Sequence, residues 1–265
     1  MKINLIIFLL FSPYSFSLLA QKADLQQPFQ DCKMKGSITI FDYKAQKWIY
    51  SDEKDAKFET VPASTFKILN SLIAIEEGII KDPHLVVKWD GVQRDISPWN
   101  ADTDLANAYK NPTLWFYQEI ARKLGKEKYK SYLKKCGYGN QNLKSEIDRF
   151  WLDGSLKISP KNQVDLLVKL YERKLPFSQK TYDIVKEVMI NEKTEDYTLY
   201  AKTGWGKVEA KDIGWWVGYF ETKDNVYFFA TRVWKYIEIT NEDFMACRKN
   251  ITYKVMEGLG FIPSK

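Results

Sequence analysis

The chain has 265 residues, of which 45% are hydrophobic and 15% aromatic. This composition can supply a substantial core, and it excludes a globally disordered protein. Lysine and arginine total 40 against 34 acidic residues, a net charge of +6, but the charges are interleaved along the chain. We therefore expect solvated charged faces, and no basic stripe of the kind that binds nucleic acid.

The first 20 residues have the pattern of a secretory signal peptide. Lys2 supplies the positive charge, residues 3–11 form a largely apolar run, and Ala20 is a small residue suited to cleavage. The run is too short to span a bilayer, and no later stretch is long and apolar enough to do so. We expect an exported protein, periplasmic or secreted, without a membrane anchor, whose residues 21–265 form a single domain.

Three cysteines follow the signal peptide, Cys32, Cys136 and Cys247. An odd number leaves at least one free thiol, and any single pairing is possible. Three small buried thiols are favoured over one disulfide. The cysteine spacing is not that of zinc ligands, and the one histidine, His84, lies in a charged, proline-containing turn. We therefore expect no metal site and no Ser-His-Asp hydrolase.

The mature chain begins with a predicted β-hairpin. Two strand-like runs, 38–41 and 47–50, flank a short turn at 44–46. A charged loop then leads to a stretch with a different pattern.

Residues 61–75 predict a buried helix. Pro62 and Ser64 are residues that begin helices, and the apolar residues that follow cover most of the helix circumference. Residues three apart share a helix face, so Lys67 lies beside Ser64. A desolvated lysine can be the base that a nucleophilic serine needs, and free N–H groups at a helix N-terminus suit a developing oxyanion.

The rest of the chain is predicted to be helical in its middle and strand-rich near its end. Loops and short helices are expected at 81–111, and longer helices at 115–124, at 126–135, after a cap at Ser159, and from Ser178 to about 190. Strands are expected at 197–202, 213–221 and 226–233, and a last helix at 242–257. This order predicts an α+β domain: an antiparallel sheet built from both termini and flanked by helices, with an inserted helical lobe.

The spacing Ser-x-x-Lys occurs three times. Ser51 lies in a charged loop and Ser131 on a lysine-rich helix, so both are expected to be solvated. Only Ser64 heads an apolar helix, where the amine of Lys67 is partly desolvated and its pKa is lowered. These two residues are therefore the candidate nucleophile and base, although the spacing alone is a weak signal.

A second candidate is Lys202-Thr203-Gly204, which occurs once, at the end of a predicted strand. Glycine permits close approach of the backbone, and a cation beside a hydroxyl suits a substrate carboxylate. An extended substrate could also pair with an edge strand there. Taken alone, an ordinary strand end with a surface lysine is the commoner explanation.

The two motifs together, in this order and in a chain without a usable histidine, resemble the penicillin-recognising serine enzymes. Further segments narrow the resemblance to class D β-lactamases, in the family's order over roughly residues 36–262. They are Pro-Ala-Ser-Thr-Phe-Lys at 62–67, Trp-Asp-Gly at 89–91, Trp-Asn at 99–100, Tyr-Gly-Asn at 138–140, Phe-Trp-Leu-Asp at 150–153, Lys-Thr-Gly at 202–204 and Gly-Trp-Trp-Val-Gly at 214–218. The fold implied is β-lactamase/transpeptidase-like, and the partner implied is a small-molecule β-lactam.

The resemblance implies catalytic roles for particular residues. Ser64 would attack the β-lactam carbonyl and be acylated. Lys67, N-carboxylated by CO2, would be the general base for acylation and deacylation, with no separately bound cofactor. Trp151 would donate its indole N–H to that carbamate, and the backbone N–H groups of Ser64 and Trp205 would form the oxyanion hole.

The resemblance also implies a substrate-binding set, which consists of Lys202, Thr203, Gly204, Arg248 and Leu114. The guanidinium of Arg248 suits a carboxylate, and Leu114 would form an apolar wall near Lys67.

One position departs from the family pattern. The family has Ser-x-Val ahead of the helix expected at Trp115, and Pro112-Thr113-Leu114 aligns with it. Proline has no hydroxyl and no N–H, whereas the family serine helps to deliver a proton to the leaving nitrogen. Losing a positioned proton donor typically costs ~10²–10⁴-fold in rate, unless Thr113 or Asn111 substitutes.

The sequence thus predicts a serine β-lactamase that hydrolyses β-lactam antibiotics through an acyl-enzyme on Ser64. The alternative is a β-lactam-binding or sensing protein that is acylated but turns over poorly because of Pro112. A peptidase acting on cell-wall peptides is a third and weaker option. The sequence leaves the substrate spectrum and the oligomeric state open.

Overall fold

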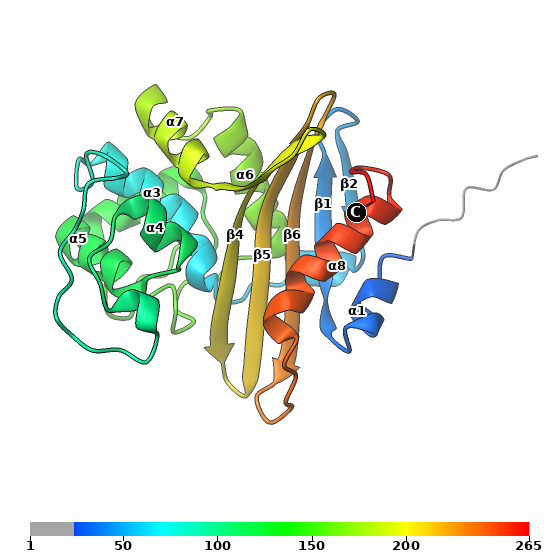
Figure 1. Ribbon diagram of the computed structural model, residues 1–265, viewed down its shortest axis with the longest axis horizontal. Coiled ribbons are helices and arrows are strands. Elements are labelled where there is room, and N and C mark those ends of the chain that lie inside the picture. The colour runs from blue at the N-terminus through cyan, green and yellow to red at the C-terminus, as the bar shows by residue number, and fades with distance from the viewer. Residues whose placement is uncertain (1–23, 265) are drawn as a thin grey trace, which may run out of the picture.

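The computed structural model describes residues 24–264, so the predicted signal peptide lies outside the described residues. Within them, six strands form one antiparallel sheet in the order β2-β1-β6-β5-β4-β3 (Figure 1). The strands are β1 (Lys35–Asp42), β2 (Lys47–Tyr50), β3 (Ile190–Lys193), β4 (Tyr197–Val208), β5 (Lys211–Thr222) and β6 (Val226–Tyr236). Because β1 pairs with β6, the first hairpin closes onto the last strand, and the prediction of a sheet built from both termini is confirmed.

Helices from the middle of the chain form the predicted lobe beside the β4 edge of the sheet (Figure 1). The α-helices are α1 (Gln27–Asp31), α2 (Glu53–Lys57), α3 (Lys67–Glu76), α4 (Leu105–Lys110), α5 (Leu114–Cys136), α6 (Pro160–Tyr171), α7 (Gln179–Val188) and α8 (Phe244–Gly258), and short 3-10 helices lie at Ala63–Phe66 and Ser97–Trp99. Helices α3, α4 and α5 make up the lobe, and all of α2 to α7 lie between β2 and β3 in the sequence.

Both faces of the central strands are buried. Helices α1 and α8 cover one face, where Trp216 and Phe229 belong to one apolar cluster. Helix α6 covers the other face, where Val217 and Phe228 belong to a second cluster that extends into the lobe. A strand that is covered on both faces is apolar without alternation, which explains the nearly unbroken apolar run of β5.

Several predicted boundaries are confirmed and others are corrected. The two helices expected around residue 125 are the halves of α5, which is broken at Gly125, where φ is 74°. Strand β4 does not end at Lys202 but continues to Val208, because its backbone pairs with β5 along its whole length. The Lys-Thr-Gly motif therefore lies inside a strand. The short elements α1 and β3 were not predicted, and α2 lies where a charged loop was expected.

The expectation of three free cysteines is wrong. Cys32 and Cys247 form a disulfide across a sequence separation of 215 residues, and Cys136 is free and buried. Helix α1 packs on α8, and this tertiary contact brings the two cysteines together. A pairing at such separation leaves no local pattern in the sequence.

We expect Cys32→Ser to lower the free energy of unfolding by about 2–5 kcal/mol, because the disulfide closes a very long loop of the unfolded chain. Urea unfolding with and without reductant measures this. The reductant should lower the unfolding midpoint of the wild type and leave that of Cys32→Ser unchanged. Equal midpoints for the oxidised wild type and the variant would contradict the prediction.

Candidate active site

A cavity of about 330 Å³ brings most of the predicted site residues together. Its lining comprises Ser64, Ile96, Trp99, Asn111, Pro112, Leu114, Leu152, Thr203, Gly204, Trp205, Met245 and Arg248. The three remaining predicted residues, Lys67, Trp151 and Lys202, are buried and do not belong to this lining. The cavity therefore has a wall from the helical lobe and a wall from β4 and α8.

Ser64 lies on a tight turn that several contacts hold in place. The sequence predicted one helix here, but a 3-10 turn (Ala63–Phe66) carries the serine, and α3 begins only at Lys67. Ala63 has a φ of 49°, a conformation that a residue with a Cβ seldom adopts and that clusters at active sites. Its N–H donates to the carbonyl oxygen of Trp151 at 3.0 Å, and the indole of Trp215 donates to the carbonyl oxygen of Val61 at 2.9 Å.

Lys67 is a buried lysine that has no carboxylate partner within the described residues 24–264. Its side chain is 1% exposed, its Nζ donates to the carbonyl oxygen of Thr113 at 3.2 Å, and it lies 4.5 Å from the ring centroid of Tyr117. Burial, and secondarily the charge of Lys202, hold the pKa of Lys67 well below the ordinary value for lysine. The environment thus favours a neutral amine, which can accept a proton or react with an electrophile.

Trp151 carries a buried polar atom with no partner. The residue is fully buried, its ring stacks on Phe66 at 5.6 Å, and its Nε1 has no hydrogen-bond acceptor within the described part of the chain. The side-chain Nδ2 of Asn70, one helical turn beyond Lys67, and Oγ1 of Thr113 are buried and unpartnered as well. An unsatisfied buried group costs about 1–3 kcal/mol. Such donors fit an anionic group carried by Lys67, because a carbamate presents two oxygens that accept hydrogen bonds.

The β4 wall depends on a glycine. A Cβ built on Gly204 would lie 3.0 Å from Cγ2 of Thr65 and 3.1 Å from the carbonyl oxygen of Pro62. A Cβ at this position would push the turn that carries Ser64 away by a few tenths of an ångström, so glycine favours the close approach of β4. The predicted reason for glycine in the Lys-Thr-Gly motif, close approach of the backbone, is borne out by these distances.

Two cations lie on this side of the site. The side chain of Lys202 is 4% exposed, and its Nζ donates to the carbonyl oxygen of Thr203 at 3.2 Å. Burial, followed by the charges of Arg248 and Lys249, lowers the pKa of Lys202 to about 7. Arg248 donates to the carbonyl oxygen of Gly204 at 2.6 Å, and burial lowers its pKa to about 10. Arg248 thus stays cationic at neutral pH, and its buried Nε has no partner within residues 24–264.

We expect kcat/KM for a carboxylate-bearing substrate to fall as pH rises through about 7. Below that value Lys202 is an ammonium ion and attracts the substrate carboxylate, and above it the charge is lost while Arg248 keeps its own. The fall should be roughly tenfold, the effect of about 1.4 kcal/mol. A pH profile of kcat/KM measures it. Lys202→Arg should remove the fall, because a guanidinium stays charged, and a flat wild-type profile would contradict the assignment.

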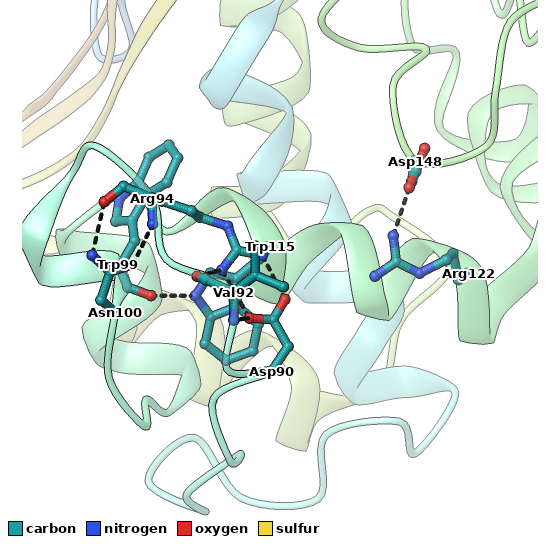
Figure 2. A network of polar contacts seen from close by, with 8 residues as sticks. All are labelled: Asp90, Val92, Arg94, Trp99, Asn100, Trp115, Arg122 and Asp148. Atoms are coloured by element: carbon teal, nitrogen blue, oxygen red, sulfur yellow. Dashed lines mark hydrogen bonds and ion pairs between the residues drawn. The ribbon is translucent and has the colours of Figure 1, made fainter.

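A polar network holds the lobe wall of the cavity (Figure 2). The indole of Trp115 donates to the carbonyl oxygen of Trp99 at 2.7 Å. The indole of Trp99 in turn donates to the carbonyl oxygen of Asn111 at 3.0 Å. The backbone N–H of Arg94 donates to Oδ1 of Asn100, and its guanidinium to Oδ1 of Asp90, each at 2.8 Å. The Trp-Asp-Gly and Trp-Asn segments thus fix Trp99 in the cavity wall.

Figure 2 also shows the ion pair of Arg122 with Asp148, whose atoms lie 2.6 Å apart. This ion pair ties α5 to the loop before Trp151.

Pro112 lies in the cavity wall between Asn111 and the first residue of α5, Leu114. No hydroxyl is available at this position. Thr113 is 1% exposed and does not line the cavity, whereas Asn111 does. An amide is a very weak acid, so neither neighbour reproduces a serine at position 112.

Several lining residues were not among the predicted site residues: Ile96, Trp99, Asn111, Leu152 and Met245. Met245 precedes Arg248 by three residues on α8, so helical spacing could have indicated it. Ile96 lies in a loop without periodicity and left no signal. His84, as expected, lies in a loop with a largely exposed side chain.

Residues 24–264 contain neither a metal-ligand cluster nor a helix that could cross a membrane. No cluster of three potential metal-ligating His, Cys, Asp or Glu side chains is present there. None of the helices there has the length and apolar character needed to cross a bilayer.

Comparison with known proteins identifies the class that this fold and site define. A sequence model of the family described as the penicillin binding protein transpeptidase domain matches residues 37–257. The chain is therefore a penicillin-recognising serine protein with the transpeptidase-like fold.

Individual relatives narrow the class. The β-lactamase OXA-48 of Klebsiella pneumoniae is 40% identical over 236 residues, which cover 89% of this chain and 87% of that protein. A class D β-lactamase from Sebaldella termitidis ATCC 33386 is 50% identical in structure-based comparison, with a TM-score of 0.87 over 90% of this chain and 96% of that one. The C-terminal domain of the Bacillus licheniformis BlaR penicillin-receptor is 32% identical, with a TM-score of 0.84 over 91% and 96%. The chain belongs to the class D serine β-lactamase family.

Proposed function

We propose that this protein hydrolyses β-lactam antibiotics through an acyl-enzyme on Ser64. The observation that carries the proposal is the pairing of Ser64, which lines the cavity, with Lys67, a buried lysine three residues later whose pKa is lowered. Arg248 lies in the opposite wall of the cavity. Oγ of Ser64 attacks the lactam carbonyl carbon, the C–N bond breaks, and the nitrogen takes up a proton. Water then attacks the ester carbonyl and releases the ring-opened acid and Ser64.

The chain's own residues support each part of this reaction. Backbone N–H groups of Ser64 and Trp205 are proposed to bind the oxyanion, because donors aimed at developing charge stabilise the transition state. Arg248 and Lys202 are proposed to bind the substrate carboxylate, and Thr203 to donate a hydrogen bond to it. Leu114 and Leu152 supply an apolar lining for the rest of the substrate.

We infer that the base is Lys67 N-carboxylated by CO2. The low pKa supports this, because only the neutral amine reacts with CO2. The unpartnered Nε1 of Trp151 is the proposed donor to the carbamate, with Asn70 and Thr113 as further unpartnered groups near the turn. When formed, the carbamate supplies an anionic oxygen base in place of an ammonium ion, and hydrolysis then needs no histidine.

We expect Trp151→Phe to lower kcat by roughly 10–100-fold, because a hydrogen bond to a charged group contributes about 1.5–3 kcal/mol. Added bicarbonate should recover part of the loss. With ¹³C-labelled bicarbonate, the wild type should give a carbamate carbon signal in NMR spectra that is weakened in Trp151→Phe. An equally strong signal in the variant would contradict the assignment of Trp151, whatever the activity.

The second candidate is a β-lactam sensor that is acylated and does not turn over. The similarity to a protein named as a penicillin-receptor favours it, whereas the missing serine at Pro112 bears on the acylation step that both candidates share. Hydrolysis of a chromogenic cephalosporin in large excess distinguishes the two. Sustained hydrolysis that bicarbonate stimulates supports the β-lactamase, whereas a burst of one equivalent followed by no further product supports the sensor.

A further inference from the structure

The indole of Trp205 is unusually well held for an exposed side chain. Trp205 follows the Lys-Thr-Gly motif on β4, is 48% exposed and lines the cavity. An aromatic residue with this exposure would ordinarily change rotamer readily. Here its Nε1 donates to Oδ1 of Asp212 at 2.9 Å. Nζ of Lys207 lies 5.6 Å from the ring centroid and adds a cation–π contact.

The acceptor is itself fixed. Asp212 is 6% exposed, and its Oδ2 accepts from Nζ of Lys235 at 2.8 Å. Asp212 and Lys235 are direct partners in the β5–β6 register, and Lys207 is the partner of Asp212 on β4. Trp205 is therefore diagonal to Asp212 on the same face, within reach for a long aromatic side chain. One row of side chains thus crosses three strands and ends at the cavity.

Asp212 remains an ionised acceptor in this row. Burial acts to raise its pKa, but the hydrogen bonds from Lys235 and then Trp205 outweigh burial, and the pKa lies below the ordinary value for aspartate. A charge-assisted hydrogen bond is shorter and stronger than a neutral one. The anchor is accordingly stronger than a serine or an amide at this position would be.

We propose that Asp212, braced by Lys235, is a positioning residue that holds the Trp205 indole as a rigid wall of the cavity, so that the acyl substituent of a bound substrate meets an ordered surface. The proposal rests on the proposed function. The other lining residues near the opening, among them Ile96, Leu152 and Met245, are apolar, so a bulky apolar group would contact the indole and these side chains together. A wall that is already ordered loses no rotamer freedom when such a substrate binds.

The test compares oxacillin, whose acyl substituent carries an aromatic ring, with 6-aminopenicillanic acid, which has no acyl substituent. Asp212→Leu should raise KM for oxacillin by roughly three- to tenfold, the loss of one hydrogen bond, with little change in kcat. KM for 6-aminopenicillanic acid should stay within about twofold of wild type. Trp205→Phe, which keeps the backbone N–H assigned to the oxyanion hole, should raise the ratio of the two KM values by the same factor, and adding Asp212→Leu to it should not raise that ratio further. Equal effects on both substrates would overturn the proposal.

A second readout is independent of turnover. The indole N–H resonance of Trp205, identified by its absence in Trp205→Phe, should exchange with deuterium more slowly in the wild type than in Asp212→Leu. The same exchange rate in both proteins would overturn the proposal. If Asp212→Leu does not fold, Asp212→Asn, which keeps an acceptor but loses the charge, should exchange faster than the wild type and have a higher KM for oxacillin, and wild-type values for both would overturn the proposal. Lack of any acylation by a fluorescent penicillin in the wild type would instead contradict the proposed function.

Discussion

Replacing Ser64 by alanine should abolish β-lactam hydrolysis, with a fall in kcat on the order of 10⁴–10⁶-fold. The side chain is the proposed nucleophile, and the tight turn at Ala63, the close approach of Gly204 and the Trp151 carbonyl all fix its position. Binding energy alone cannot replace a missing nucleophile. Steady-state hydrolysis of a chromogenic cephalosporin and labelling by a fluorescent penicillin measure the loss.

The other Ser-x-x-Lys serine on a helix provides a matched control. Ser131 and Lys134 lie on α5 with the same spacing, but both are exposed. Ser131→Ala should keep wild-type hydrolysis and labelling. Labelling that persists in Ser64→Ala, or that disappears in Ser131→Ala, would contradict the assignment of the nucleophile.

Pro112→Ser should raise kcat, by as much as ~10²-fold, because it restores a hydroxyl in the cavity wall where the family has its proton-delivering serine. Proline at this position can neither donate nor relay a proton. The variant should act on the step in which the lactam nitrogen leaves, so its effect should appear in the acylation rate. Single-turnover kinetics with a chromogenic cephalosporin measure that rate.

Pro112→Ala is the matched control, because it removes the proline ring without adding a hydroxyl. It therefore separates the effect of the hydroxyl from the effect of losing the ring. Alanine should leave the acylation rate near that of the wild type, whereas serine should raise it. Equal rates in Pro112→Ser and Pro112→Ala would mean that another group already delivers the proton. Thr113→Val would then test the one neighbouring hydroxyl, and a lower acylation rate in that variant would contradict the conclusion that neither neighbour of Pro112 replaces the serine.

The buried polar groups around Lys67 show how function and stability compete in this fold. Nε1 of Trp151, Nδ2 of Asn70 and Oγ1 of Thr113 are unpartnered, and the amine of Lys67 is desolvated. Each such group destabilises the folded state by an amount comparable to a lost hydrogen bond. Thr113 contacts Lys67 directly, Asn70 follows Lys67 by three residues on α3, and Trp151 stacks on Phe66, so a functional explanation is favoured for these three groups.

The sequence could indicate those candidate site residues that lie close together in the chain. Ser64 and Lys67 lie on one helical turn, and Lys202 to Gly204 are consecutive, so spacing alone could indicate them. The hairpin at residues 38–50 and the caps Ser159 and Ser178 followed from local residue preferences and are confirmed. Arg248 was indicated only through the resemblance to the family.

What the sequence could not indicate depends on tertiary contacts. The Cys32–Cys247 disulfide requires α1 to pack on α8, and the anchor of Trp205 requires the register of three strands. Ala63, with its left-handed φ, is held by a hydrogen bond from its N–H to the carbonyl oxygen of Trp151, far away in the chain. None of these contacts leaves a periodicity or a motif in the residues that make it.

The most direct test of the central claim is intact-mass spectrometry during reaction with excess benzylpenicillin. The account predicts that one penicillin mass is added to the protein, that peptide mapping places it on Ser64, and that the adduct disappears as many equivalents of ring-opened product accumulate. No adduct in any time sample together with no product, or an adduct that persists after a single equivalent has reacted, would contradict hydrolysis through an acyl-enzyme on Ser64.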